Sequence, residues 1–351
     1  MAKKALITGI TGQDGSYLAK LLLDKGYQIY GTYRRVSTSN FWRLQHLGIL
    51  DKVYLIPSDL SDTGSIIEAL KISCPNEIYH LAAQSFVEGS FEAPVSTGDL
   101  NGLAVTRLLE AIRHNRPDVR LYFAATSEMF GDNHSTNRPL TENDFFNPMS
   151  PYAAAKLYGY WISRIYRKGY RLFAANGIMF NHESPLRGLE FVTRKISNDV
   201  AKISLGLSKE IRLGNLDAKR DWGYAPEYVE SMWRMLQQSE PDDYVVATGE
   251  GHSVREFAQR AFEVVGMDWE QYVKIDRSFF RPLDVSGLVG DCSKTEKKLG
   301  WKPETKFDRI VEIMVNEDIS RWRRWLTGER FPWDAPNQPS EMNVLTRALR
   351  M

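Results

Sequence analysis

The chain has 351 residues, of which 43% are hydrophobic and 25% are charged, and its 45 Lys and Arg residues balance 44 Asp and Glu residues to a formal net charge of +1. This length is enough for two domains or for one large domain with a lobe, and the composition excludes disordered, collagen-like and miniprotein classes. A nearly neutral chain has no overall field to attract nucleic acid or an anionic membrane, so any polyanion should be a small ligand bound locally.

The first half of the chain alternates short apolar segments with segments of helical periodicity. Residues 5–8 predict a strand, followed by a glycine turn and a helix that ends near Gly26. Further strands are predicted at residues 28–32, 53–56, 77–81 and 120–125, and a helix at residues 105–112. Strands that alternate with helices predict an α/β fold, a Rossmann-type doubly wound parallel sheet.

Beyond about residue 180 the alternation becomes less regular, and we expect a smaller, mixed α/β carboxyl-terminal lobe. Residues 181–188 read as a loop with proline and glycine, and residues 191–205 as a helix. The predicted division is a Rossmann domain over residues 1–180, completed by parts of 215–250, a lobe over 181–325 and an extension over 326–351. Arginines and tryptophans alternate at residues 321–325, where a packed helix end is favoured over a membrane or RNA patch.

Residues 8–15 read T-G-I-T-G-Q-D-G, which places glycines at positions 9, 12 and 15 between a strand and a helix. Glycines allow a tight turn and let backbone amides approach a pyrophosphate, and the helix amino terminus adds a positive dipole. A plain tight turn would use the same glycines, but the strand before them and the helix after them favour a dinucleotide site.

Nucleotide choice is read at the end of the second strand, where an acidic side chain would bind the ribose hydroxyl of NAD. The chain has Arg34 and Arg35 there, and no acid before Asp51. Arginines suit a 2′-phosphate, so this segment favours NADP over NAD, with a solvated basic loop as the alternative.

Tyr152 and Lys156 are four residues apart at the start of an alanine-rich helix, so the phenol and the ammonium share one face. Such a tyrosine can take a proton from a substrate hydroxyl. Thr126 and Glu128 follow the fifth strand, at the sheet edge where ligands bind. Thr126 can orient the tyrosine or the substrate oxygen, whereas Glu128 adds an acid/base that suggests elimination of water alongside hydride transfer. A bland helix face and a solvated loop acid are the alternatives.

With these residues assembled, the sequence resembles the extended short-chain dehydrogenase/reductase family, and within it the GDP-mannose 4,6-dehydratase family. The resemblance spans about residues 3–325. Its most specific segments are T-G-I-T-G-Q-D-G-S-Y-L, T-S-E-M-F-G, S-P-Y-A-A-A-K-L-Y, F-N-H-E-S-P-L-R-G, F-V-T-R-K-I and L-G-N-L-D-A-K-R-D-W-G.

The resemblance implies a hydro-lyase that converts GDP-mannose into GDP-4-keto-6-deoxymannose with NADP, and that needs no metal. It implies catalytic roles for Thr126, Glu128, Tyr152 and Lys156. The implied cofactor contacts are Gly9, Ile10, Thr11, Gly12, Gln13, Asp14, Arg34, Arg35, Asp59, Leu60, Leu81, Ala82, Ala83, Gln84, Ser85, Tyr152, Lys156, His182 and Arg187. The implied substrate contacts, in the lobe over residues 181–325 and beside it, are Ser85, Glu128, Asn181, Lys195, Arg220 and Arg281.

Three positions depart from the family pattern: Asp284 stands where glutamate is usual, Ser96 where many members have tyrosine, and Met149 where arginine is usual. They leave open which sugar is accepted. A GDP-heptose dehydratase and a reductase of 4-keto-6-deoxy nucleotide sugars are the alternative enzymes, and a non-catalytic NADP sensor is the alternative from another class.

The resemblance also implies a homodimer or homotetramer, because in the family the loop over residues 34–43, which here carries Phe41 and Trp42, reaches a neighbouring subunit. Two features predict a cytoplasmic protein. The chain has only two cysteines, Cys74 and Cys292, and it has neither a signal-peptide core nor an apolar run of the ~18 residues that a membrane span needs.

Overall fold

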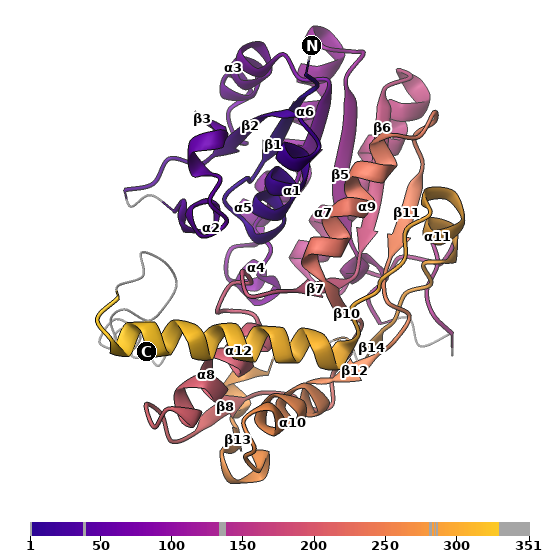
Figure 1. Cartoon of the computed structure of the whole chain (residues 1–351). Helices are drawn as coiled ribbons and strands as arrows, with labels where there is room; N and C mark the ends of the chain where they lie inside the picture. Colours follow the sequence, from indigo (N-terminus) through magenta and orange to yellow (C-terminus); the bar gives the residue numbers. More distant parts are fainter. Residues whose placement is uncertain are drawn as a thin grey trace.

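In the part of the chain that the structure describes, seven parallel strands form the central sheet, in the order β11-β6-β5-β4-β1-β2-β3. The computed structural model describes residues 2–37, 40–132, 138–280, 283, 285 and 287–329. The strands are β1 (Lys4–Thr8), β2 (Gln28–Tyr33), β3 (Tyr54–Pro57), β4 (Glu77–His80), β5 (Arg120–Thr126), β6 (Phe173–Met179) and β11 (Asp243–Val246). Helices cover both faces of this sheet (Figure 1), which confirms the predicted Rossmann-type α/β class.

Two hydrophobic clusters, one on each face, hold the helices to the sheet. One face packs against α1 (Gln13–Asp24) and α9 (Ala225–Leu236). The other packs against α3 (Thr63–Ser73), α6 (Ala104–Asn115) and α7 (Pro151–Gly169). Between β4 and α6 the chain forms α4 (Val87–Glu92), α5 (Pro94–Gly98) and a π-helical turn, η2 (Asp99–Leu103).

The five strands predicted in the first half are confirmed to within one residue at each end. Buried parallel strands are continuous apolar runs, which is why their positions could be read from sequence. The prediction omitted β6. It was also wrong in treating all of residues 181–188 as a loop, because Asn181–Glu183 form strand β7, which pairs in parallel with β10 (Trp222–Tyr224).

The lobe beside the sheet has a core of its own. It contains α8 (Val192–Ser204), as the sequence predicts, with α10 (Val254–Val264) and α12 (Phe307–Leu326). Short strands complete it: β8 (Ile211–Leu213) with β13 (Val273–Ile275), and β9 (Lys219–Arg220) between β12 (His252–Ser253) and β14 (Gly287–Leu288). Helix α11 (Ser293–Leu299) packs instead beside β11. In Figure 1, α12 lies across the lobe below the sheet.

The arginine- and tryptophan-rich segment belongs to the end of α12 and is packed. Arg321 and Trp322 are buried, and the Trp322 indole donates to Asn198 Oδ1 at 2.9 Å. The part of the predicted extension over residues 330–351 lies outside the described residues. Within the described ranges, no helix has both the length and the apolar character that crossing a bilayer requires.

Of the two aromatic residues in the loop expected to reach a neighbouring subunit, Trp42 is buried. Trp42 opens the short helix α2 (Trp42–His46) and is only 3% exposed, so its ring packs inside its own subunit. Phe41 lies edge-on to Tyr33, with ring centroids 5.1 Å apart.

Candidate active site

A pocket of about 700 Å³ opens where the carboxyl ends of the sheet strands face the lobe. In a parallel sheet this edge collects the loops that follow each strand, so residues far apart in sequence meet there. Most of the site residues that the sequence predicts line this pocket. They are Gly9, Thr11, Gly12, Gln13, Asp14, Arg34, Asp59, Leu60, Leu81, Ala82, Ala83, Gln84, Ser85, Thr126, Glu128, Tyr152, Lys156, Asn181, His182, Arg187, Lys195 and Arg220.

Three predicted residues differ. Ile10 is completely buried in the core, and its side chain fills the space beside Gly31, so only its backbone belongs to the loop that borders the pocket. Arg35 is exposed and is not part of the described pocket wall. Arg281 lies outside the described residues, as does Asp284 among the three departures from the family pattern. Of the other two departures, Ser96 lines the pocket, whereas Met149 packs against the core.

The glycine-rich loop between β1 and α1 is shaped for close approach. Gly9 has φ +73°, a conformation that favours glycine, and a Cβ there would lie 2.8 Å from the Ala82 Cα. A Cβ on Gly15 would collide with the Gly9 carbonyl. Helix α1 begins directly after Gly12, so its free amide groups and positive dipole face the pocket.

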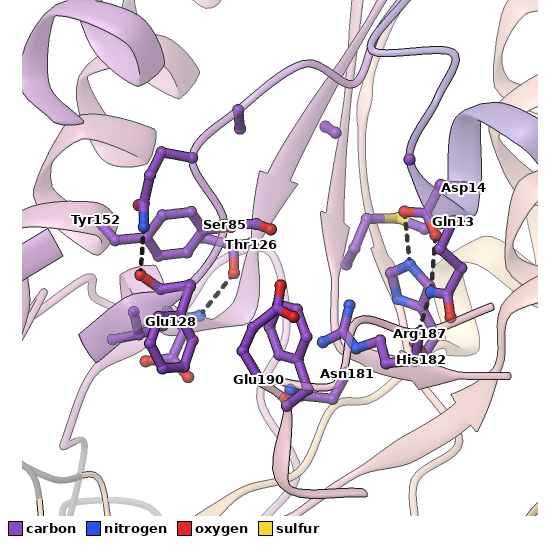
Figure 2. Close-up of a pocket in the computed structure, with 18 of the residues that line it drawn as sticks. Gln13, Asp14, Ser85, Thr126, Glu128, Tyr152, Asn181, His182, Arg187 and Glu190 are labelled. Atoms are coloured by element: carbon purple, nitrogen blue, oxygen red, sulfur yellow. Dashed lines mark hydrogen bonds and ion pairs between the residues drawn. The ribbon is translucent and has the colours of Figure 1, made fainter. Parts of the chain in front are cut away.

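Asp14 and His182 connect the glycine loop to strand β7, as Figure 2 shows. His182 Nε2 lies 2.8 Å from Asp14 Oδ2, and its Nδ1 lies 2.7 Å from the Phe180 carbonyl oxygen. A carbonyl and a carboxylate can only accept, so this arrangement favours a doubly protonated, positively charged imidazole. Burial lowers the pKa of His182, but the charge and hydrogen bond of Asp14 outweigh burial and raise it overall.

Gln13 strengthens the same connection. Its side-chain nitrogen donates to the His182 carbonyl oxygen at 3.1 Å, and its side-chain oxygen accepts from the Ser184 hydroxyl at 2.7 Å. Tyr228 stacks on the His182 ring with centroids 4.7 Å apart, so the imidazole is held on its flat face as well as at both nitrogens.

Thr126, Glu128, Tyr152 and Lys156 come together at the end of β5 and the start of α7. The helix starts well, because Pro151 occupies its first turn and the Ser150 hydroxyl accepts from the Ala153 amide at 3.1 Å. Lys156 Nζ donates to the Ala124 carbonyl oxygen at 2.9 Å, which fixes the ammonium beside β5.

Burial shifts the pKa values of Tyr152 and Lys156. It raises the pKa of Tyr152 to about 12, although a side-chain hydrogen bond with Thr126 acts in the opposite direction. It lowers the pKa of Lys156 to about 8. The Thr126 hydroxyl also accepts from the Glu128 amide at 3.3 Å, and this places the Glu128 carboxyl at the pocket wall (Figure 2). With a pKa of about 12, the Tyr152 phenol is protonated near neutral pH.

The far wall of the pocket comes from the lobe. Lys195 on α8 lies over the Phe279 ring, 3.6 Å from its centroid, and burial lowers its pKa. Arg220 on β9 is 8% exposed, and its Nη1 donates to the Val285 carbonyl oxygen at 2.8 Å. Both cations border the pocket at fixed positions, as anion recognition requires.

Several residues that line the pocket were not predicted from the sequence, among them Ser58, Phe86, Glu88, Glu183, Glu190, Phe191 and Phe279. Glu183, Glu190 and Phe191 lie inside or beside the F-N-H-E-S-P-L-R-G segment, and that proximity is the signal that could have found them. No sequence signal brings Phe279 to α8, because the contact depends on the lobe's tertiary packing.

This glycine loop, with a tyrosine and a lysine one helical turn apart beside a threonine from the adjacent strand, defines a short-chain dehydrogenase/reductase. Residues 6–314 match the family described as "GDP-mannose 4,6 dehydratase". The chain belongs to this family.

Individual relatives agree. The chain is 49% identical to GDP-mannose 4,6 dehydratase 2 of Arabidopsis thaliana, over 92% of this chain and 88% of the plant protein. It is 47% identical to GDP-mannose 4,6 dehydratase of Homo sapiens, over 91% of this chain and 92% of the human protein. Among solved structures, the UDP-glucose 4-epimerase of Thermus thermophilus, in complex with NAD, superposes with a TM-score of 0.78 at 26% identity, over 90% of this chain and 98% of that one.

Proposed function

We propose that this protein catalyses the NADP-dependent dehydration of GDP-mannose to GDP-4-keto-6-deoxymannose. The proposal depends chiefly on one observation: Glu128, an acid that simple ketone reduction does not need, lines the same pocket as Thr126 and Tyr152. Family membership over most of the chain supports the same reaction.

The pocket has features that suit a nicotinamide dinucleotide. The glycine loop packs so closely on Ala82 that position 9 has no room for a side chain. The amino terminus of α1 faces the pocket beside this loop. The buried Gln84 side-chain oxygen, which borders the pocket, has no hydrogen-bond partner among the described residues. When bound, the cofactor would accept a hydride from sugar C4 and return it to C6.

The protein's own side chains then supply the proton transfers. In its phenolate form, which the positive charges of Lys156 and of a bound nicotinamide would favour, Tyr152 takes the proton of the sugar 4-hydroxyl, oriented by Thr126, and becomes the neutral phenol. Oxidation at C4 makes the C5 proton acidic. Glu128 removes that proton and delivers one to the departing 6-hydroxyl, which leaves as water. Because the hydride returns to C6, the reaction consumes no reductant.

The substrate contacts that we propose are Ser85, Glu128 and Asn181 for the sugar and its neighbourhood, and Lys195 and Arg220 for the diphosphate. Lys195 and Arg220 lie on the lobe wall, across the pocket from the glycine loop. Guanidinium and ammonium groups suit phosphate oxygens, and their partly buried setting strengthens the interaction. Residues 1–180 with β11 would thus supply most of the cofactor contacts, and residues 181–325 most of the nucleotide-sugar contacts.

NADP rather than NAD is proposed as the cofactor because Arg34 lines the pocket directly after β2. Asp59, after β3, is already engaged: its pKa is lowered first by the hydrogen bond from the Ser61 amide and then by the Ser61 hydroxyl. Arg34 thus places a guanidinium, which would bind the 2′-phosphate of NADP, at the position where NAD-selective sites carry an acid.

A homodimer or homotetramer is proposed from the outer face of α7. Tyr158, Trp161 and Ile165 are 42%, 47% and 56% exposed, and their spacing puts them in one stripe. Trp161→Glu should shift the protein to a lower mass in analytical ultracentrifugation. A cytoplasmic location is also proposed, supported by two cysteines that are both unpaired.

The function is tested by incubating the protein with a panel of nucleotide sugars, without added reductant, and measuring product masses. Loss of one water from GDP-mannose supports the proposal. Loss of water only from a GDP-heptose would reassign the substrate, whereas turnover only of a 4-keto-6-deoxy sugar with reduced cofactor would identify a reductase. Cofactor binding without turnover of any sugar would indicate a sensor.

A further inference from the structure

The turn over residues 185–187, which carries Arg187 into the pocket, presents three successive backbone carbonyls to arginine side chains from three helices. Arg194 Nη1, on α8, donates to the Pro185 oxygen at 3.0 Å and to the Arg187 oxygen at 2.8 Å. Arg321 Nη1, on α12, donates to the Pro185 oxygen at 2.7 Å. Arg43 Nε, on α2, donates to the Leu186 oxygen at 2.8 Å.

A buried carboxylate makes this arrangement possible. Asp318 on α12 is 1% exposed, and both of its oxygens accept from Arg194 Nε, at 3.1 and 3.0 Å. It also accepts from Arg321 Nη1 at 3.3 Å and from the Ser197 hydroxyl at 2.6 Å. Two guanidinium groups could not remain in the protein interior without such neutralisation, because an uncompensated buried charge is strongly unfavourable.

We propose that Arg194, held by Asp318, is a positioning residue that sets the location of Arg187 in the pocket. The inference rests on the proposed role of Arg187 in cofactor binding. The guanidinium end of Arg187 is already held, because its Nε lies 3.2 Å from Glu183 and its guanidinium stacks on Phe191 at 3.7 Å, so Arg194 adds a second point of attachment at the backbone end. Fixing the carbonyl of residue 187 from behind determines where the chain, and so the side chain, enters the pocket.

The same turn is linked to the glycine loop, which gives the positioning a direct path to the cofactor. Besides its bond to Leu186, Arg43 donates through Nη1 to the Thr11 carbonyl oxygen at 3.3 Å. Helix α12, distant in sequence from the dinucleotide motif, acts on the same turn through Asp318 and Arg194.

Arg194→Lys tests the proposal, because lysine keeps the positive charge beside Asp318 but cannot reproduce the planar fork that spans two carbonyls. The matched control is Arg120→Lys. Arg120 Nη1 also spans two carbonyls, those of Leu236 and Gln238 at 2.6 and 2.8 Å, but it lies at the opposite end of the sheet. We expect Arg194→Lys to raise the NADPH dissociation constant about tenfold, and Arg120→Lys to leave it within about twofold of wild type.

A double-mutant cycle separates positioning from general structural damage. If Arg194 acts through Arg187, then Arg194→Lys should change NADPH affinity less than about twofold in an Arg187→Ala background. If the fold-losses in NADPH affinity of the two variants multiply in the double mutant, the two residues act independently and the proposal is overturned. An unchanged NADPH affinity in Arg194→Lys alone would overturn it too. If Arg187→Ala itself binds NADPH like wild type, the assigned cofactor role of Arg187 fails first, and the positioning role falls with it.

Arg321→Lys keeps the experiment decisive if Arg194→Lys does not fold. Arg321 reaches only the Pro185 carbonyl of the turn, so we expect a smaller weakening of NADPH binding, about threefold, again absent in the Arg187→Ala background. Unchanged NADPH affinity in a folded Arg321→Lys protein would count against the turn as the route of the effect.

Discussion

His182 and Asp14 form an ion pair, with 2.8 Å between Nε2 and Oδ2, that joins the glycine loop to strand β7 across the floor of the pocket. The two residues are 168 positions apart in sequence. Their charges depend on each other, since the pKa of His182 is raised by Asp14 and the pKa of Asp14 is lowered by His182, in each case against the effect of burial.

This pair predicts a pH-dependent stability. The folded-state pKa of His182 lies above its usual value of 6.5, so its stabilisation is complete below pH 6.5 and is lost as the pH rises through the raised pKa. Asp14 stabilises the folded protein fully at pH values above its usual pKa of 3.8, and this stabilisation is lost as the pH falls through its lowered folded-state pKa. The difference in melting temperature between wild type and His182→Gln should therefore be largest between pH 3.8 and 6.5 and shrink in alkali. A difference that does not change with pH would contradict the charged pair.

For Lys156 we expect the opposite of His182: its contribution to the free energy of unfolding should increase as the pH rises. Its folded-state pKa is about 8, below the usual 10.5, so the unfolded chain binds more protons between these values. The free energy of unfolding should rise by roughly 3 kcal/mol across that interval relative to Lys156→Met, which has no charge to bury. Urea unfolding of both proteins at several pH values measures this, and parallel pH profiles would refute it.

Glu128→Gln should separate oxidation from elimination. The variant keeps Tyr152 and Thr126, so partial oxidation at C4 should continue, while C5 proton removal and loss of water should fall by at least about 100-fold. Deuterium exchange at C5, followed by NMR in heavy water, measures the step directly. Wild-type exchange in Glu128→Gln would eliminate the assigned role. Tyr152→Phe is the companion variant, and it should lose hydride transfer itself.

Arg34 and Arg35 are adjacent in sequence but differ in position, because only Arg34 lines the pocket. Arg34→Ala should weaken NADP⁺ binding about tenfold and leave NAD⁺ binding nearly unchanged, because NAD⁺ has no 2′-phosphate for Arg34 to contact. Arg35→Ala should have a smaller effect on either nucleotide. Isothermal titration of both cofactors decides between them, and equal losses for NADP⁺ and NAD⁺ in Arg34→Ala would argue against 2′-phosphate recognition.

Gly9 and Gly26 both have a positive φ, +73° and +81°, but only Gly9 is crowded. Gly26→Ala should cost about 1 kcal/mol from backbone strain alone and leave NADP⁺ binding intact, because nothing lies within 4 Å of the added Cβ. Gly9→Ala meets the Ala82 backbone in addition, so it should destabilise the protein more and abolish cofactor binding. Thermal denaturation with and without NADP⁺ compares the two, and retained binding in Gly9→Ala would show that the loop is not closely packed on the cofactor.

The fold could be predicted where one local signal decided the structure. Strands β1 to β5 are apolar runs bounded by turn residues, and α8 has a clear helical period. Strand β6 was missed because Asn176 and Gly177 interrupt its apolar run. Its partner β11 follows the lobe's first strands, so their pairing depends on long-range packing.

The pocket residues, too, could be predicted where a local sequence signal places them and not where long-range packing does. Those after the ends of the strands, such as Thr126 and Glu128, could be expected together because parallel strands end at one edge. The pairing of β7 with β10 and the contact of Phe279 with Lys195 could not, since each joins segments that are distant in sequence. Arg194 is only seven to nine residues from the carbonyls of the 185–187 turn, but its anchor Asp318 is 124 residues away, and no local signal indicates that contact.

The position of β11 at the edge of the central sheet has a consequence for synthesis on the ribosome. The chain leaves the sheet after β6 and returns only with residues 243–246, so during translation the outer edge of β6 stays uncovered while more than sixty further residues are made. An uncovered strand edge is a template for pairing with other chains. A fragment ending near residue 180 would therefore carry the glycine loop and the Thr126, Tyr152 and Lys156 group and still tend to aggregate. A nascent chain is exposed to chaperones or to misassociation throughout this interval.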